Sequence, residues 1–302
     1  MRTIILALLI ATLATSAQAD YSRLYFDHVP TASTLSGDTE ITYRVFNRGE
    51  KNPKLLLIMG LGGAGAAWGD AFIQGLEFEG FEIIVIDNRD TGGSTRFTEW
   101  GEPTLWWQLL KYELGFSVDA PYTLTDMAAD SIAVLDAASY EQVHVMGVSM
   151  GGMIAQVLAA KHPERVISLT SIMSTTFAPH LPPPTSVAET NLRALAEGDA
   201  KASREQAMRD RGFFPESMER HLMAIFHAGD RTKEVQTIDR PTLVIHGSED
   251  PLIPPEHGVH TAEQIEDAQF VLIEGMAHNL PESFHSQIIG LMSDHINSAH
   301  TP

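Results

Sequence analysis

The chain has 302 residues, 44% of them hydrophobic, which is enough for one large core and makes an α/β domain with an insertion simpler than two domains. It contains no cysteine, which excludes disulfides and cysteine nucleophiles and leaves oxygen or nitrogen for covalent chemistry. Its formal net charge of -19 at pH 7 repels nucleic acid and anionic membrane surfaces, so we expect a neutral or cationic small molecule as the partner.

The N-terminal segment, residues 1–19, has the pattern of a cleaved signal peptide. Arg2 precedes an apolar stretch over residues 4–13, and Ala17-Gln18-Ala19 forms a small-residue cleavage site. The apolar stretch is short for a membrane anchor, which needs about 20 residues. We therefore predict cleavage after Ala19, a periplasmic or secreted protein, and no stable membrane insertion of the mature chain.

Strand and helix signals alternate along the rest of the chain. Apolar or β-branched runs predict strands at residues 39–47, 54–59, 81–87, 143–148, 165–172, 241–247 and 269–275. Helical runs are expected among them at residues 122–138, 150–161, 255–266 and 281–296. Runs that are apolar on both faces suit a parallel sheet covered by helices. The alternation predicts an α/β fold with a mostly parallel, doubly wound sheet.

Two segments interrupt this alternation. Residues 174–238 contain "APHLPPPT" and charged helical runs but no clear strand pattern, which predicts a helical cap over a site. The core is then formed by residues 20–173 and 239–302. Residues 97–121 are rich in aromatic side chains, which either line a substrate pocket or, as is commoner, pack the cap onto the core. These aromatics are Trp100, Trp106, Trp107, Tyr112 and Phe116.

The stretch "VMGVSMGGM" places Ser149 in a G-x-S-x-G pattern between a predicted strand and a predicted helix. That context is typical of a nucleophile elbow, a strained turn that lifts a serine hydroxyl above the edge of a sheet. Such a turn has room only for small neighbours, which Gly147, Gly151 and Gly152 supply. The alternative is an ordinary N-cap serine, which would not need glycine at these flanking positions.

A serine nucleophile requires a histidine base and an acid that orients it. Among 13 histidines, His278 lies in the loop after the last predicted strand, where it can reach back over the sheet edge. Asp250 follows the strand at 241–247, with Glu249 as its competitor for the acidic role. The chain order Ser149, Asp250, His278 is the order of α/β-hydrolases.

Two backbone amides are candidates for an oxyanion hole: that of Met150 at the start of the helix after Ser149, and that of Leu61 in the glycine-rich loop "MGLGGAG". This loop lacks the Walker A pattern and the spacing of a dinucleotide motif, so we predict no nucleotide cofactor.

His257 and His260 have a helical spacing that can bind a metal, but no third ligand accompanies them. We therefore predict no metal and no other cofactor.

Five motifs in order, "LLLIMGLGG", "VIDNRDTGGST", "HVMGVSMGGMIAQVLA", "PTLVIHGSEDPLIPPEHG" and "IEGMAHNLP", resemble the α/β-hydrolases, within them the aclacinomycin methylesterase-like branch of serine esterases. The resemblance spans residues 55–281 and implies Ser149 as nucleophile, His278 as base, Asp250 as its partner, and the Leu61 and Met150 amides as the oxyanion hole. The chain departs from the family pattern at Met59, where many relatives have histidine, and at Ala277, where glycine is common. Its aromatic insertion is also longer than expected, and this third departure leaves the identity of the substrate open.

Residues 87–95, "DNRDTGGST", are interpreted as a structured turn without a catalytic step, with Arg89 in an internal ion pair.

The expected function is hydrolysis of a carboxylic ester, with a methyl ester among the candidates, of a small and largely apolar substrate through an acyl-enzyme on Ser149. A lactonase, an amidase or aminopeptidase, and a carbon–carbon bond hydrolase can all use the same triad. Dehalogenases and epoxide hydrolases of this kind carry aspartate at the position of Ser149. A binding protein without catalysis is the alternative from another class. The sequence does not indicate an oligomeric state.

Overall fold

The computed structural model describes residues 24–101, 105–185 and 201–299, so the predicted signal peptide lies outside the described residues. The described chain forms an 8-stranded sheet in the order β1-β2-β4-β3-β5-β6-β7-β8. β2 is antiparallel to both of its neighbours, and the other pairs are parallel. The strands are β1 (Thr31–Ser36), β2 (Thr39–Phe46), β3 (Lys54–Ile58), β4 (Glu82–Ile86), β5 (Val143–Val148), β6 (Val166–Ile172), β7 (Thr242–Gly247) and β8 (Gln269–Ile273). The predicted mostly parallel α/β sheet is confirmed.

β1 is the one strand of the sheet that was not predicted from the sequence. It lies at the edge of the sheet, and its residues, TASTLS, alternate between exposed and half-buried. The other strands match the seven predicted runs to within two residues at each end. Six of them are buried on both faces or nearly so, and β8, which is partly exposed, still carries the apolar run FVLI. β1 was not predicted because four of its six residues are polar, so it has no apolar run to indicate a strand.

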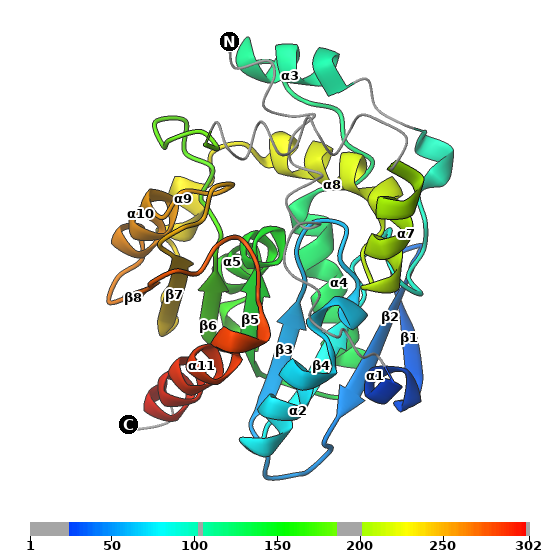
Figure 1. Cartoon of the computed structure of the whole chain (residues 1–302), viewed down its shortest axis with the longest axis vertical. Helices are drawn as coiled ribbons and strands as arrows, with labels where there is room; N and C mark the ends of the chain where they lie inside the picture. Colours follow the sequence, from blue (N-terminus) through cyan, green and yellow to red (C-terminus); the bar gives the residue numbers. More distant parts are fainter. Residues whose placement is uncertain (1–23, 102–104, 186–200, 300–302) are drawn as a thin grey trace.

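Helices cover both faces of the sheet (Figure 1). α2 (Asp70–Phe78) and α11 (His285–Ala299) pack against each other on one face, where α2 contacts β4 and α11 contacts β6. The opposite face is covered by α4 (Leu124–Ala137), α5 (Met150–Lys161) and α10 (Glu256–Gln264). A short helix, α1 (Leu24–His28), precedes β1. Among the described residues, no helix is both long and apolar enough to span a lipid bilayer.

The strand order reverses direction beside β3. The chain passes from β3 to β4 on one side and then continues with β5 on the other side of β3. Ile58 at the end of β3 therefore pairs with Gly147 near the end of β5. Loops that leave neighbouring parallel strands at such a switch point diverge and leave room for a ligand between them. The loops after β3 and β5 thus meet where a site is expected.

The range predicted as a cap contains three described helices: α7 (Lys201–Asp210), α8 (Pro215–Ala228) and α9 (Thr232–Val235). Residues 186–200 of this range lie outside the described residues, and the cap as a unit stays a prediction. Helix α8 crosses above the sheet near the end of α4 (Figure 1).

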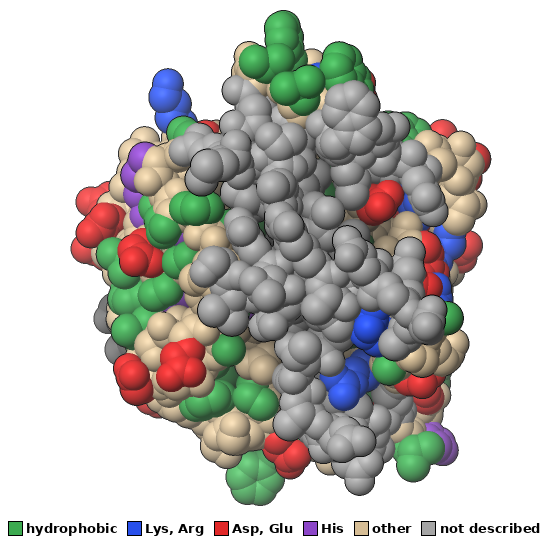
Figure 2. Space-filling view, turned by 45° about the horizontal axis from the view of Figure 1, so that its top comes forward, with side chains coloured by type: hydrophobic (Ala, Val, Ile, Leu, Met, Phe, Trp, Pro, Cys, Tyr) green, Lys and Arg blue, Asp and Glu red, His purple; other side chains and the backbone are tan. Residues whose placement is uncertain are grey.

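The aromatic insertion contains η4 (Thr98–Trp100) and α3 (Leu105–Glu113), which lies outermost on the cap side in Figure 1. Tyr112 packs against Phe177 and Phe226, as expected for a packing role. Trp107 and Phe116 are instead 46% and 65% exposed. Hydrophobic side chains also gather at the top of the face drawn in Figure 2. The insertion therefore combines packing contacts with an exposed apolar surface.

Candidate active site

Ser149 occupies the sharp turn between β5 and α5. Its backbone has φ 55° and ψ -121°, a left-handed conformation that is uncommon for any residue except glycine. A Cβ atom at Gly147 would lie 2.2 Å from the carbonyl oxygen of Gly151, and one at Gly151 would lie 2.1 Å from that of Ile58. Both distances are impossible, so the turn requires glycine at these positions, as predicted.

The hydroxyl of Ser149 does not cap the helix that follows it. Although Ser149 occupies the N-cap position of α5, its side chain makes no capping hydrogen bond. Its Oγ lies 3.0 Å from Nε2 of His278 instead. The ordinary N-cap interpretation is therefore wrong, and the hydroxyl is directed at an imidazole.

His278 lies between Ser149 and Asp250 in one chain of hydrogen bonds. The loop after β8 carries His278, and the loop after β7 carries Asp250. Nδ1 of His278 donates to Oδ2 of Asp250 over 2.7 Å, which fixes the tautomer and leaves Nε2 free to accept from the serine. His278 is 5% and Asp250 3% exposed, so the relay is largely shielded from water. The structure thus brings together the three side chains selected from the sequence.

Asp250 is held as an anion. Burial alone would raise its pKa, but the charge of His278 and hydrogen bonds from His246 and His278 outweigh burial and hold the pKa well below its usual range. Its other oxygen, Oδ1, accepts from the amides of Leu252 and Ile253, both over 2.9 Å. An ionised, fixed carboxylate can orient the imidazole and stabilise the imidazolium that forms during proton transfer.

The competing residues point elsewhere. Glu249 is exposed, whereas Asp250 is buried against the histidine. His257 and His260 contact the hydroxyls of Thr175 and Thr176. Across the described residues, no group of three or more His, Cys, Asp or Glu side chains is arranged to hold a metal ion.

The two candidate oxyanion donors flank the serine. Met150 is the first residue of α5 and directly follows Ser149. Leu61 follows Gly60, where an added Cβ would lie 3.1 Å from Cβ and 3.6 Å from Oγ of Ser149. Within the described ranges, neither the Leu61 nor the Met150 amide has a hydrogen-bond partner in the protein. Two unsatisfied N–H donors beside a reactive hydroxyl are what a developing oxyanion requires.

The turn at residues 87–95 is a network of buried charges, and the predicted internal ion pair of Arg89 is present. Nε and Nη2 of Arg89 donate to Asp130 over 2.7 and 2.6 Å. Asp90 has a left-handed backbone, φ 72°, and accepts from Nε and Nη2 of Arg220 over 2.5 and 3.0 Å. Because Arg220 belongs to α8, this second pair ties the predicted cap to the core.

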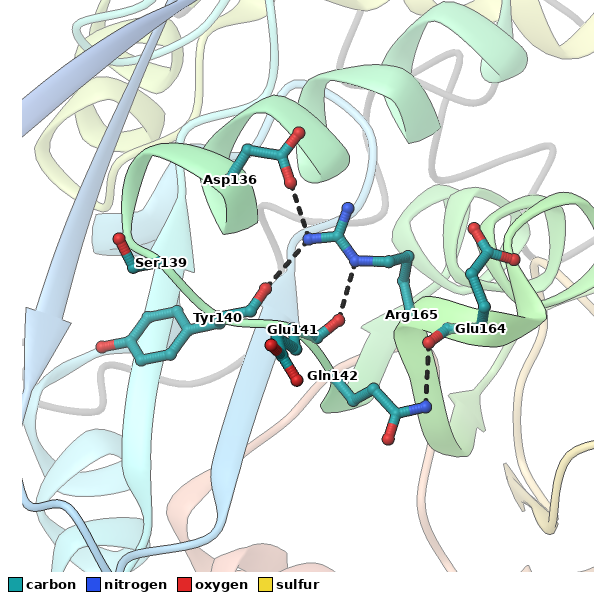
Figure 3. A pocket seen from close by; sticks show the side chains of 7 residues that line it. All are labelled: Asp136, Ser139, Tyr140, Glu141, Gln142, Glu164 and Arg165. Atoms are coloured by element: carbon teal, nitrogen blue, oxygen red, sulfur yellow. Dashed lines mark hydrogen bonds and ion pairs between the residues drawn. The ribbon is translucent and has the colours of Figure 1, made fainter.

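A pocket elsewhere on the molecule does not compete with this site. It lies beside the connections that enter the amino ends of β5 and β6, whereas Ser149 follows the carboxyl end of β5. Figure 3 shows the residues that line it. The guanidinium of Arg165 is engaged by Asp136 and by the carbonyls of Tyr140 and Glu141 at 2.7–2.9 Å. The pocket is lined by Asp136, Ser139, Tyr140, Glu141, Gln142, Glu164 and Arg165.

Two buried histidines near the site were not singled out from the sequence. His246, at the end of β7, has Nε2 2.8 Å from the carbonyl of Ile253 and 3.4 Å from Oδ2 of Asp250. His221, on α8, lies 3.0 Å from the amide of Gly62 in the loop of the candidate oxyanion hole. The chain separation of 159 residues between Gly62 and His221 explains why no local pattern revealed this contact.

Comparison with known proteins gives three kinds of match. A family model described as the alpha/beta hydrolase fold matches residues 53–211. The chain is 28% identical over 296 residues to a rhodomycin D methylesterase of Streptomyces sp., and the match covers 81% of this chain and 91% of the relative. It is also 28% identical over 289 residues to the rhodomycin D methylesterase of Streptomyces peucetius, with the same coverage. A thermophilic esterase from Thermogutta terrifontis superposes with a TM-score of 0.64 at 20% identity over 90% of this chain and 100% of that one.

Proposed function

Because the chain belongs to the alpha/beta hydrolase family, we propose that it is a serine hydrolase that cleaves a carboxylic ester through an acyl-enzyme on Ser149. The observation that carries the proposal is the continuous relay from Asp250 through His278 to Ser149, with distances of 2.7 and 3.0 Å. A serine hydroxyl is a weak nucleophile at neutral pH, and such a relay is the usual means of activating it.

The acylation step follows from these contacts. Nε2 of His278 removes the proton from Ser149 as Oγ attacks the ester carbonyl, and Asp250 stabilises the imidazolium. The amides of Leu61 and Met150 donate to the oxyanion of the tetrahedral intermediate. When the intermediate collapses, the alcohol leaves with the proton from His278 and the acyl group stays on Oγ.

Deacylation uses the same groups. His278 removes a proton from a water molecule, whose oxygen attacks the acyl carbonyl, and the same two amides stabilise the second oxyanion. The carboxylic acid is released when Ser149 recovers its proton. The half-buried serine between largely buried partners limits the access of bulk water during both steps.

Two observations support a small, largely apolar ester as the substrate, with a methyl ester as the first candidate. Both relatives at 28% identity given above are methylesterases by name, and they align over most of their length. The negative net charge of this chain also disfavours an anionic substrate. Lactones, amides and carbon–carbon substrates remain rivals because the same triad serves all of them.

The location of the protein is a separate proposal that rests on the sequence alone. We propose export with removal of residues 1–19, which places the enzyme in the periplasm or outside the cell. N-terminal sequencing of the mature protein should begin at Asp20, and retention of Met1 would contradict export by this route.

The function is tested by hydrolysis rates on a panel of methyl esters, lactones and amides with matched variants. Ser149→Ala should lower kcat by about 10,000-fold or more on every substrate that the wild type cleaves. Ser174→Ala is the control, because its hydroxyl donates to the backbone carbonyl of Ser149 over 2.8 Å and is not one of the groups that link Asp250, His278 and Ser149. We expect this control to stay within about tenfold of wild type. Equal rates for wild type and Ser149→Ala would overturn the proposal.

A further inference from the structure

The loop that carries the Leu61 amide is held by the segment that leads into α8. This oxyanion loop, residues 60–65, pairs with residues 212–214 through an antiparallel bridge between Gly63 and Phe213. The amide of Phe214 donates to the carbonyl of Gly62 over 2.7 Å, and that of Ala64 donates to Gly212 over 2.9 Å. The loop is rich in glycine and therefore has little conformational preference of its own. Its shape must be fixed by these outside contacts.

His221 adds the contact nearest to the candidate oxyanion donor. The amide of Gly62 donates to Nδ1 of His221 over 3.0 Å, and Nε2 of His221 donates to the carbonyl of Arg89 over 3.0 Å. An amide can only donate, so Nδ1 must be the bare nitrogen and Nε2 must carry the proton. Burial lowers the pKa of His221 to about 4, which keeps the ring neutral and able to accept near pH 7.

The turn geometry explains why the Gly62 amide matters. The amide of Gly63 donates to the carbonyl of Gly60 over 3.0 Å, and Gly62 has φ +66°, as expected at the third position of a type II turn. The peptide between Leu61 and Gly62 would point the opposite way in a type I turn. An acceptor for the Gly62 N–H holds the peptide between Leu61 and Gly62 in one orientation. This peptide is joined at the Cα atom of Leu61 to the peptide that carries the Leu61 N–H, so holding the first restricts the position of the second.

We propose that His221 is a positioning residue, whose Nδ1 holds the Gly62 amide and thereby keeps the Leu61 N–H aimed at the oxyanion. This role rests on the proposed ester hydrolysis, because it assigns no chemistry to His221 itself. It also links the predicted cap to catalysis, since α8 supplies the acceptor while Arg220, the preceding residue, anchors the helix to Asp90.

Two variants of His221 separate positioning from simple packing. Asparagine places an acceptor oxygen near the position of Nδ1 but loses the donor to Arg89. Glutamine reaches the carbonyl of Arg89 but leaves the Gly62 amide without its acceptor. Both remove the ring and leave comparable space, so a purely structural role predicts similar losses for the two.

The assay measures kcat and KM for p-nitrophenyl acetate together with the melting temperature of each variant. We expect His221→Gln to lower kcat by about 10- to 100-fold with KM within about threefold, because a misaimed donor affects the transition state more than substrate binding. His221→Asn should retain kcat to within about threefold of wild type, at a melting temperature similar to that of His221→Gln.

The outcomes distinguish this inference from the proposed function. Equal kcat values for the two variants, with the wild type active, would overturn the role of His221 and leave ester hydrolysis standing. A wild type that neither cleaves the ester nor reacts with a fluorophosphonate would overturn both. If the variants do not fold, nitrogen NMR of the wild type decides the matter: a protonated Nδ1 on His221 at pH 7 would contradict the proposed hydrogen bond.

Discussion

Replacement of Arg220 by methionine should destabilise the protein by far more than the loss of an ordinary surface charge. Arg220 and Asp90 are 4% and 0% exposed at the side chain and are joined by two hydrogen bonds. Without the guanidinium, the hydrogen bonds left to the carboxylate from the described part of the chain come from Tyr122 and the amide of Phe97, at 2.9 and 3.1 Å. Removing one partner of a buried ion pair costs about 3–5 kcal/mol, a large part of a typical stability of about 5–15 kcal/mol.

Urea denaturation followed by circular dichroism measures this cost. Arg209→Met is the matched control, because Arg209 lies 3.3 Å from Glu216 with side chains 37% and 41% exposed, and loss of such a pair should cost less than about 1 kcal/mol. Adding Asp90→Asn to Arg220→Met should recover at least about 1 kcal/mol, because asparagine removes the uncompensated charge and tolerates the left-handed backbone. A cost below about 1 kcal/mol for Arg220→Met, or full additivity of the two changes, would refute the reasoning.

Three further predictions concern the site and the core. Asp250→Asn should lower kcat on the same ester by about 1,000- to 10,000-fold, because the amide disturbs the tautomer of His278; a loss below tenfold would contradict the relay. Gly151→Ala should lower the melting temperature sharply, since its Cβ would lie 2.1 Å from a carbonyl oxygen, whereas Gly290→Ala, with nothing within 4 Å, should be neutral or stabilising. The pKa of His221 is lowered from 6.5 to about 4, so the unfolded state binds more protons between these values, and stability should fall as pH drops from 6.5 to 4. His221→Asn should lose less stability over that range than the wild type, by up to about 3 kcal/mol, and equal losses would refute the assignment.

The parts of the molecule that the sequence predicted are those set by local chemistry. The strands and the Ser149 turn are local in this sense: a buried strand must be apolar, and the close approach of Gly147 and Gly151 to backbone oxygens admits no side chain. Asp250 was predicted from the sequence with Glu249 as its competitor, and the fold distinguishes these adjacent carboxylates by burial, since Asp250 is buried and Glu249 is exposed.

The parts that escaped prediction depend on contacts between distant segments. Nothing near His221 indicates that its ring accepts from Gly62, and nothing near Asp90 indicates that it pairs with Arg220, 130 residues away. Strand β1 was not predicted because its mostly polar residues bury little surface at the sheet edge. Contacts between distant segments depend on the tertiary structure, so local residue patterns do not predict them.

The most direct test of the proposed chemistry is to locate the covalent bond formed with a mechanism-based reagent. The wild type should be treated with a fluorophosphonate, digested, and mapped by mass spectrometry. We predict one label for each protein molecule, on Ser149 in the peptide that contains "GVSMGG", and no label in Ser149→Ala. A protein that cleaves esters while this serine stays unlabelled, or that carries the label on another residue, would contradict an acyl-enzyme on Ser149.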